Sequence, residues 1–188
     1  ILRKTIALQL EDKLIMSLKN LGIPNVRFKV IFEECEPTIN GIDKVNFMFS
    51  ANPGLPLAPL AETASGGEKS RVLLAIKAIF SAFDQANLLI FDEIDSGVSG
   101  SVSSYVANLL SELSAHRQVF CVTHQPLIAA FADNHFAFKK IVIDGKTVSK
   151  LTCLKERADR QKELASLAGG EIVEAKDYAA SLLEHKAA

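Results

Sequence analysis

The sequence predicts an α/β fold with a parallel-sheet core, flanking helices and an antiparallel edge. The segments NLLIFDE (87–93) and RQVFCVTH (117–124) each contain a short continuous apolar run, which is typical of strands buried on both faces of a parallel sheet. The amphipathic helical pattern at 102–116 lies between them, so we expect a strand–helix–strand unit with helices over both faces of the sheet. The alternating segments VRFKVIFEE (26–34) and KVNFMFSAN (44–52) predict a separate antiparallel pair.

A first helix is predicted over residues 1–22, where leucine and isoleucine recur at helical spacing between charged residues. Gly22 and Pro24 end this helix. The antiparallel pair follows, with Asn40-Gly41 in its turn, and then a proline-rich loop over 53–59. Another helix begins at Gly66. We expect one buried stripe on it, made of Val72, Leu73, Ile76, Ile79, Phe80 and Phe83.

The remaining elements close the fold. A short helix is predicted at PLIAAFADN (126–134), followed by a hairpin of HFAFKKIVI and KTVSKLTCL. The tail, 155–188, has the pattern of two helices broken at Gly169-Gly170.

Composition limits the class of protein. A chain of 188 residues with a formal net charge of −1 is large enough for one domain and is not a uniformly basic DNA-coating protein. Cys35, Cys121 and Cys153 are odd in number and far apart, which predicts reduced thiols in a cytoplasmic protein. No apolar run approaches the ~18 residues of a membrane span, so we expect no membrane partner.

The stretch SGGE, from Ser65 to Glu68, supports two interpretations. Ser65 as N-cap and Glu68 three residues later form the S-x-x-E pattern of a capping box. Gly66 and Gly67 weaken a helix unless its backbone must approach something closely. Free N–H groups and the positive end of the helix dipole suit an anion there, so a phosphate clamp is the alternative.

Two acidic residues follow the first apolar strand. Asp92 and Glu93 lie where a parallel strand ends, the edge at which α/β sheets bind ligands. Asp92 can hold Mg²⁺ through its water shell, and Glu93 can orient or deprotonate a water. Solvated acids at the end of a strand are the simpler interpretation.

His124 follows the second apolar strand, and a right-handed crossover would bring it to the same edge. It could donate a hydrogen bond to a terminal phosphate, although a single histidine is more often structural. The loop DSGVSG (95–100), which contains Ser99, either lets another backbone pack closely or simply caps the next helix.

Together these motifs resemble the C-terminal half of an ABC-type ATPase head, with SGGE as signature motif, FDE as Walker B with the catalytic glutamate, and TH as switch histidine. SANPGLPLAPLAETASGGEKSR, LLIFDEIDSGVSG, VFCVTHQPLIAAFADNHFAFKK and LAGGEIVEAKDYAASLL are similar to the RecN family of bacterial DNA-repair proteins, which belong with the SMC-like ATPases. The similarity runs from about Val26 to Leu183. Lys69 departs from it, because many members have an apolar residue there.

The resemblance implies roles for the residues. Ser65, Gly66 and Gly67, with Glu68, would bind the γ-phosphate of ATP held by a second head. Asp92 as Mg²⁺ ligand and Glu93 and His124 as catalytic residues would act on the head's own nucleotide. Ser99 would lie near the opposing site.

It also implies an organisation. Residues 1–22 would end a coiled-coil arm that continues upstream, 23–154 would be the C-terminal head lobe, and 155–188 a helical tail. The chain has no G-x-x-x-x-G-K-[ST] P-loop, so an N-terminal lobe of the same protein is expected to supply it, and this part alone is expected to be inactive. Further expected partners are DNA and a second head, in a homodimer closed around ATP, in the bacterial cytoplasm at the nucleoid.

Three alternatives remain open. One is the head of another SMC-type chromosome or repair ATPase. Another is the ATP-binding subunit of a transporter. The last is a degenerate scaffold that dimerises or binds DNA without hydrolysing ATP.

Overall fold

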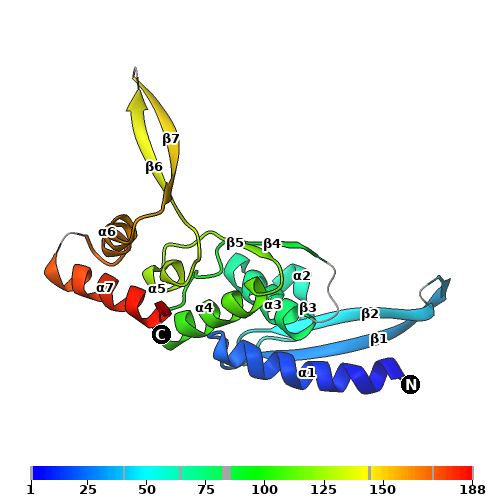
Figure 1. Cartoon of the computed structure of the whole chain (residues 1–188). Coiled ribbons are helices and arrows are strands. Elements are labelled where there is room, and N and C mark those ends of the chain that lie inside the picture. The colour runs from blue at the N-terminus through cyan, green and yellow to red at the C-terminus, as the bar shows by residue number, and fades with distance from the viewer. Residues whose placement is uncertain are drawn as a thin grey trace. The chain divides into compact units, whose positions relative to one another are not determined.

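The fold is described by a computed structural model (Figure 1). The structure describes residues 2–39, 41–63, 65–81, 86–143, 145–170 and 172–187. The chain divides into two compact units, residues 1–122 and residues 123–188. The predicted division at residues 22 and 154 stays a prediction.

The first unit begins with a helix that packs on the edge of a sheet. α1 (Leu2–Asn20) runs along β1 (Arg27–Thr38), an outer strand of its sheet (Figure 1). The buried side chains of α1 are Ala7, Glu11, Leu14 and Leu18. Ile6, which follows the predicted spacing, is instead 49% exposed.

Glu11 fastens α1 to β1. One of its carboxylate oxygens accepts a hydrogen bond from the Val30 backbone N–H at 2.8 Å, and the other lies 2.7 Å from Lys29 Nζ. An outer strand leaves backbone groups without a partner strand, so this contact satisfies one of them. Helix and sheet are therefore joined by a buried carboxylate as well as by apolar packing.

The predicted antiparallel pair is confirmed. β1 pairs with β2 (Gly41–Ser50) from Arg27 opposite Ser50 to Glu34 opposite Asp43, and the two-residue β3 (Ala58–Pro59) extends the sheet beside β2. The short helix α2 (Leu60–Thr63) follows. The predicted turn residue Asn40 lies outside the described residues.

The parallel pair is also confirmed. α3 (Gly66–Ile79) precedes β4 (Leu88–Phe91), and α4 (Ser101–Ser114) connects β4 to β5 (Gln118–Cys121). The strands run parallel, from Leu88 opposite Gln118 to Phe91 opposite Cys121.

The prediction that this sheet is covered on both faces is wrong for this chain. Leu89 and Phe91 are buried, whereas Leu88 is 46% and Ile90 63% exposed on the opposite face. Phe120 of β5 (46%) and Val122, the residue after β5 (60%), are exposed too. We refer to Leu88, Ile90, Phe120 and Val122 as the open face. A continuous apolar run indicates that both faces avoid water, but it does not show which chain segment covers each face.

The predicted stripe on α3 is only partly correct. Val72 is buried, but Leu73 is 43% and Phe80 37% exposed, and Phe83 lies outside the described residues. The helix buries Gly67, Arg71, Val72, Leu74 and Ala75. α3 packs against both α1 and α4, so its buried surface is wider than one stripe and includes an arginine.

The second unit consists of three helices and a hairpin (Figure 1). They are α5 (Pro126–Ala130), β6 (His135–Ile143), β7 (Lys146–Leu154), α6 (Arg157–Leu167) and α7 (Val173–Ala187). Its core is formed by Ala129, Ala130, Leu164, Ala165, Ala175, Ala179, Leu182 and Leu183. The predicted hairpin and the break at Gly169-Gly170 are confirmed, and both glycines have positive φ (132° and 104°). In the described part of the chain, no helix is long and apolar enough to cross a membrane.

Candidate functional site

The first turn of α3 is capped as the sequence predicts. The Ser65 side chain accepts a hydrogen bond from Glu68 N–H at 3.3 Å, and the Glu68 carboxylate accepts one from Ser65 N–H at 2.8 Å. The capping box is therefore real. It satisfies two backbone N–H groups, those of Ser65 and Glu68, and the positive end of the helix dipole remains at this end of α3.

The glycine pair lies against the acid-bearing turn that follows β4. A Cβ added to Gly67 would lie 2.9 Å from Ser96 Cβ and 3.2 Å from the carbonyl oxygen of Glu93. A Cβ added to Gly66 would lie 2.5 Å from a carboxylate oxygen of Glu93. The glycines thus permit a close approach between the start of α3 and this turn. Two motifs about 25 residues apart in the sequence are therefore in contact.

The acid-bearing turn, residues 92–96, has an unusual backbone. Glu93 has φ of 56°, and it is the only non-glycine residue with positive φ among the residues described. Its N–H donates to the Asp92 carboxylate at 2.9 Å, and its carbonyl accepts from Ser96 N–H at 3.1 Å. A glutamate in this region costs on the order of 1–3 kcal/mol, and such residues occur often at functional sites. The strained residue here is the predicted catalytic one.

Two further residues of α3, which sequence reasoning missed, hold the turn. Ser70 Oγ donates to the Asp92 carbonyl at 2.7 Å, and Arg71 Nη1 donates to the Ser96 carbonyl at 2.7 Å. Arg71 is 7% exposed, and burial lowers the pKa of its guanidinium, opposed by the charge of Glu68. Gly67 and Arg71 are four residues apart and therefore lie on the same side of the helix. This spacing is the sequence feature from which the contact of Arg71 with the turn could have been predicted.

The end of β4 is acidic. The side chains of Asp92 and Glu93 are exposed, and Asp95 is buried at 3% exposure. Burial, with added effects of Asp95 and Asp92, raises the pKa of the Cys121 thiol to about 12. Negative charge at a strand end suits a hard cation that also takes oxygen ligands from water and phosphate. Within the described ranges no three His, Cys, Asp or Glu side chains cluster to hold a metal by themselves.

Ser99 and His124 are the remaining predicted site residues. Ser99 is exposed just before Gly100, the N-cap residue of α4. His124 belongs to the second unit, and its side chain is exposed. The predicted meeting of His124 with Glu93 at one sheet edge stays a prediction.

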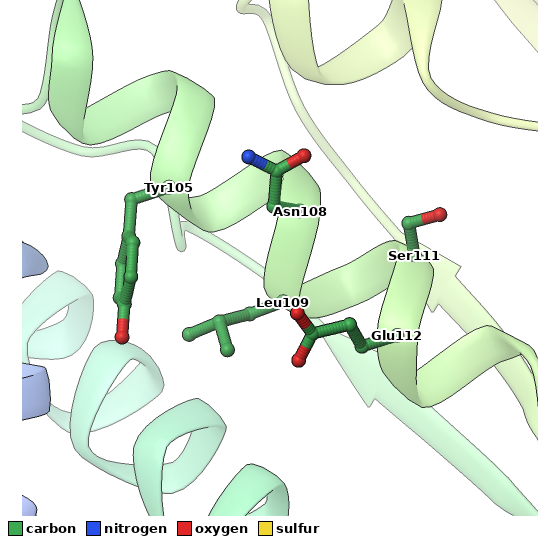
Figure 2. Close-up of a pocket in the computed structure, with 5 residues that line it drawn as sticks. All are labelled: Tyr105, Asn108, Leu109, Ser111 and Glu112. Atoms are coloured by element: carbon green, nitrogen blue, oxygen red, sulfur yellow. The ribbon is translucent and has the colours of Figure 1, made fainter.

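A separate hollow of about 470 Å³ lies on α4. Figure 2 shows Tyr105, Leu109 and Glu112 projecting from one side of that helix, with Asn108 and Ser111 beside them. None of the predicted site residues lines this hollow.

Comparison with known proteins shows a consistent relationship. The chain is 46% identical over 204 residues to the DNA repair protein RecN of Synechocystis sp., a match that covers 100% of this chain and 35% of the relative. Against RecN of Bacillus subtilis the identity is 38% over 200 residues, covering 97% and 35%. The chain therefore spans about a third of the length of these curated relatives. No protein-family model matches it.

Solved structures support the fold. The Smc head domain from Pyrococcus yayanosii has a TM-score of 0.61 at 24% identity, covering 89% of this chain and 30% of that one. The Smc head domain from Pyrococcus furiosus, bound to the C-terminal domain of ScpA, has a TM-score of 0.55 at 26% identity, covering 81% and 36%. The predicted head-lobe fold is thereby confirmed. Over nearly its whole length, the chain belongs to the RecN family of DNA repair proteins, and it corresponds to their C-terminal part.

Proposed function

We propose that this chain is the C-terminal half of an ATP-hydrolysing SMC-like head, which closes as a dimer around ATP and regulates DNA binding in double-strand break repair. One observation carries the proposal: the glycine pair that begins α3 lies directly against the turn that presents Asp92 and Glu93. A helix start that favours anions and a pair of carboxylates are thus packed together at the end of a parallel strand.

Three residues are proposed to act on the nucleotide bound by the same head. Asp92, whose side chain is exposed, would hold Mg²⁺. Glu93 orients and deprotonates the attacking water, and His124 donates to the terminal phosphate. When bound, ATP and Mg²⁺ supply the phosphoryl group and the charge that neutralises it. This chain contributes position and electrostatic stabilisation.

The start of α3 serves the opposing nucleotide. Ser65, Gly66, Gly67 and Glu68 form the signature segment that contacts the γ-phosphate held by the partner head, and Ser99 lies near the same opposing site. The capping box keeps the helix end ordered, while the first-turn N–H groups and the dipole attract the phosphate.

The rest of the site comes from an N-terminal lobe of the same protein, which carries the P-loop. The open face supports this part of the proposal. Its side chains are between 46% and 63% exposed, which is unusual for apolar residues of a parallel pair. A second lobe packed over Leu88, Ile90, Phe120 and Val122 would bury them and bring its phosphate-binding loop to the sheet. DNA is the proposed partner, and the bacterial cytoplasm at the nucleoid is the proposed location; the relatives' name, DNA repair protein RecN, supports the first of these.

The catalytic assignment is tested with Glu93→Gln in the full-length protein. The variant should bind ATP, hydrolyse it at least about 100-fold more slowly and accumulate as the nucleotide-bound dimer, because the proton acceptor is lost. Glu112→Gln, the same change at an exposed residue of α4, is the control and should behave like wild type. Hydrolysis by Glu93→Gln at the wild-type rate would show that Glu93 is not the catalytic base.

The division into two half-sites is tested separately. Ser65→Arg in the full-length protein should leave ATP binding intact and abolish ATP-dependent dimerisation, measured by light scattering. This chain alone should bind a fluorescent ATP analogue no better than about millimolar, or ~4 kcal/mol. Tight saturable binding by this chain would mean that it holds a complete nucleotide pocket, and the half-site proposal would fail.

A further inference from the structure

Gly67, Ser70 and Arg71 lie on one face of α3, three and four residues apart, and all of them face the acid-bearing turn. Ser70 bonds the carbonyl of Asp92, the first residue of that turn, and Arg71 bonds the carbonyl of Ser96, the last. Gly67 packs against the same turn, where an added Cβ would lie 2.9 Å from Ser96 Cβ and 3.2 Å from the Glu93 carbonyl oxygen. The helix therefore holds both ends of the segment that carries the acids.

These contacts are needed because Glu93, in this turn, has an unfavourable backbone conformation. With φ of 56°, Glu93 would move to a common region if its neighbours were free. Fixing the carbonyls on either side removes that freedom. Both donors reach the backbone itself, so they determine where the acids lie without occupying the carboxylates.

The burial of Arg71 is energetically costly. The guanidinium is 7% exposed, and its Nε has no hydrogen-bond partner in the described structure. Burying a cation costs free energy, and so does leaving one of its donors without a hydrogen bond. Stability alone therefore does not account for Arg71 at this position.

We propose that Ser70 and Arg71 are positioning residues, which hold the acid-bearing turn so that Asp92 and Glu93 lie correctly for hydrolysis. This inference rests on the proposed function, since it concerns how the proposed Mg²⁺ ligand and base are placed. It makes α3 a helix with two tasks. Its first turn faces the opposing nucleotide, and its second turn sets the acids of its own head.

The test uses the full-length protein with Ser70→Ala and Arg71→Gln. Each should lower kcat for ATP hydrolysis about tenfold or more, because displacement of a catalytic group by about 1 Å can cost 100-fold. KM and the Kd for ATP should stay within about twofold, because neither side chain is proposed to contact the nucleotide. Ser70→Thr, which keeps the hydroxyl, and Arg71→Lys, which keeps a charged donor, should each restore part of kcat.

Matched controls separate positioning from general stability. Arg117 Nη2 donates to the Ser81 carbonyl at 2.7 Å, and Ser114 Oγ donates to the Ser111 carbonyl at 2.8 Å. Arg117→Gln and Ser114→Ala thus remove bonds of the same kind from other elements of the first unit. Both should keep wild-type kcat.

The outcomes separate the positioning role of Ser70 and Arg71 from the proposed catalytic role of Glu93. If Glu93→Gln is inactive while Ser70→Ala and Arg71→Gln keep kcat within about twofold, the positioning role is wrong and the proposed function stands. An equal loss of kcat in the controls also overturns the positioning role. If Glu93→Gln itself hydrolyses ATP normally, Glu93 is not the catalytic base, and the proposed positioning of it fails as well. Should Arg71→Gln not fold, Ser70→Ala decides, because Ser70 is only half-buried.

Discussion

Replacing Gly67 with alanine should destabilise this chain, whereas the same change one residue earlier, at Gly66, should have little effect. At Gly67 the new methyl group would lie 2.9 Å from Ser96 Cβ. Ordinary carbon contacts lie at about 3.5–4.0 Å, so the turn would have to retreat by roughly 0.6–1.1 Å. The Ser96 carbonyl is bonded to Arg71, so this retreat also stretches a buried hydrogen bond.

The magnitude follows from two opposing effects. Overpacking costs about 1–3 kcal/mol, and alanine recovers at most ~1 kcal/mol of helix propensity in the first turn. We therefore expect a net loss of about 1–2 kcal/mol for Gly67→Ala. At Gly66 the obstacle is the end of an exposed, flexible Glu93 side chain, and a change of rotamer costs only about 0.5–1.5 kcal/mol. Propensity offsets this cost.

The measurement is urea unfolding of both variants, followed by circular dichroism and fitted with a shared m-value. Gly67→Ala should be the less stable of the two by about 1–2 kcal/mol. Equal stability, or a more stable Gly67→Ala, would refute the close approach between the helix start and the turn. In the full-length protein Gly66→Ala should still lose hydrolysis, because it displaces the Glu93 carboxylate.

Three further predictions concern stability. Glu93→Gly should be about 1 kcal/mol more stable than Glu93→Ala in urea, because only glycine relieves the positive φ; equal midpoints would contradict the strain. Glu11→Ala should lower the free energy of unfolding by about 1–3 kcal/mol, since it leaves the Val30 N–H without its acceptor; an unchanged midpoint would show that this contact is not stabilising. Burial, then the charge of Arg160, lowers the pKa of His135, so the unfolded chain takes up the proton more readily. Stability should therefore fall as pH drops through the ordinary histidine range near 6.5, and His135→Leu should flatten this dependence in thermal unfolding at several pH values.

Much of the fold could be predicted because local patterns dominate it. The alternation at 26–34, the apolar run at 88–91 and the glycine break at 169–170 all led to elements that the structure contains. The burial pattern was harder. Leu73 and Phe80 fit an apolar stripe but are exposed, while Arg71 is buried, because three-dimensional neighbours rather than periodicity decide which face is covered.

The sequence predicted the individual motifs of the candidate site but not the hydrogen bonds that join them. Ser65, Gly66, Gly67, Asp92 and Glu93 were predicted as site residues because their residue types are unusual at those positions. The bonds from Ser70 and Arg71 to backbone carbonyls leave no pattern in the sequence, since any residue supplies a carbonyl. The relatives, at 38–46% identity over nearly the whole chain, show that it belongs to the RecN family.

The open face also governs how this chain behaves in a test tube. Leu88, Ile90 and Phe120 lie exposed on β4 and β5, and Val122 follows β5 directly; in the described part of the chain these strands form a sheet of two, without a further strand at either edge. Such a surface adheres to copies of itself. The chain's colloidal behaviour should therefore depend on concentration, and its apparent size should rise with added sulfate, which strengthens apolar association. A lysine at Ile90, the most exposed of the four, is the simplest way to keep the chain dispersed.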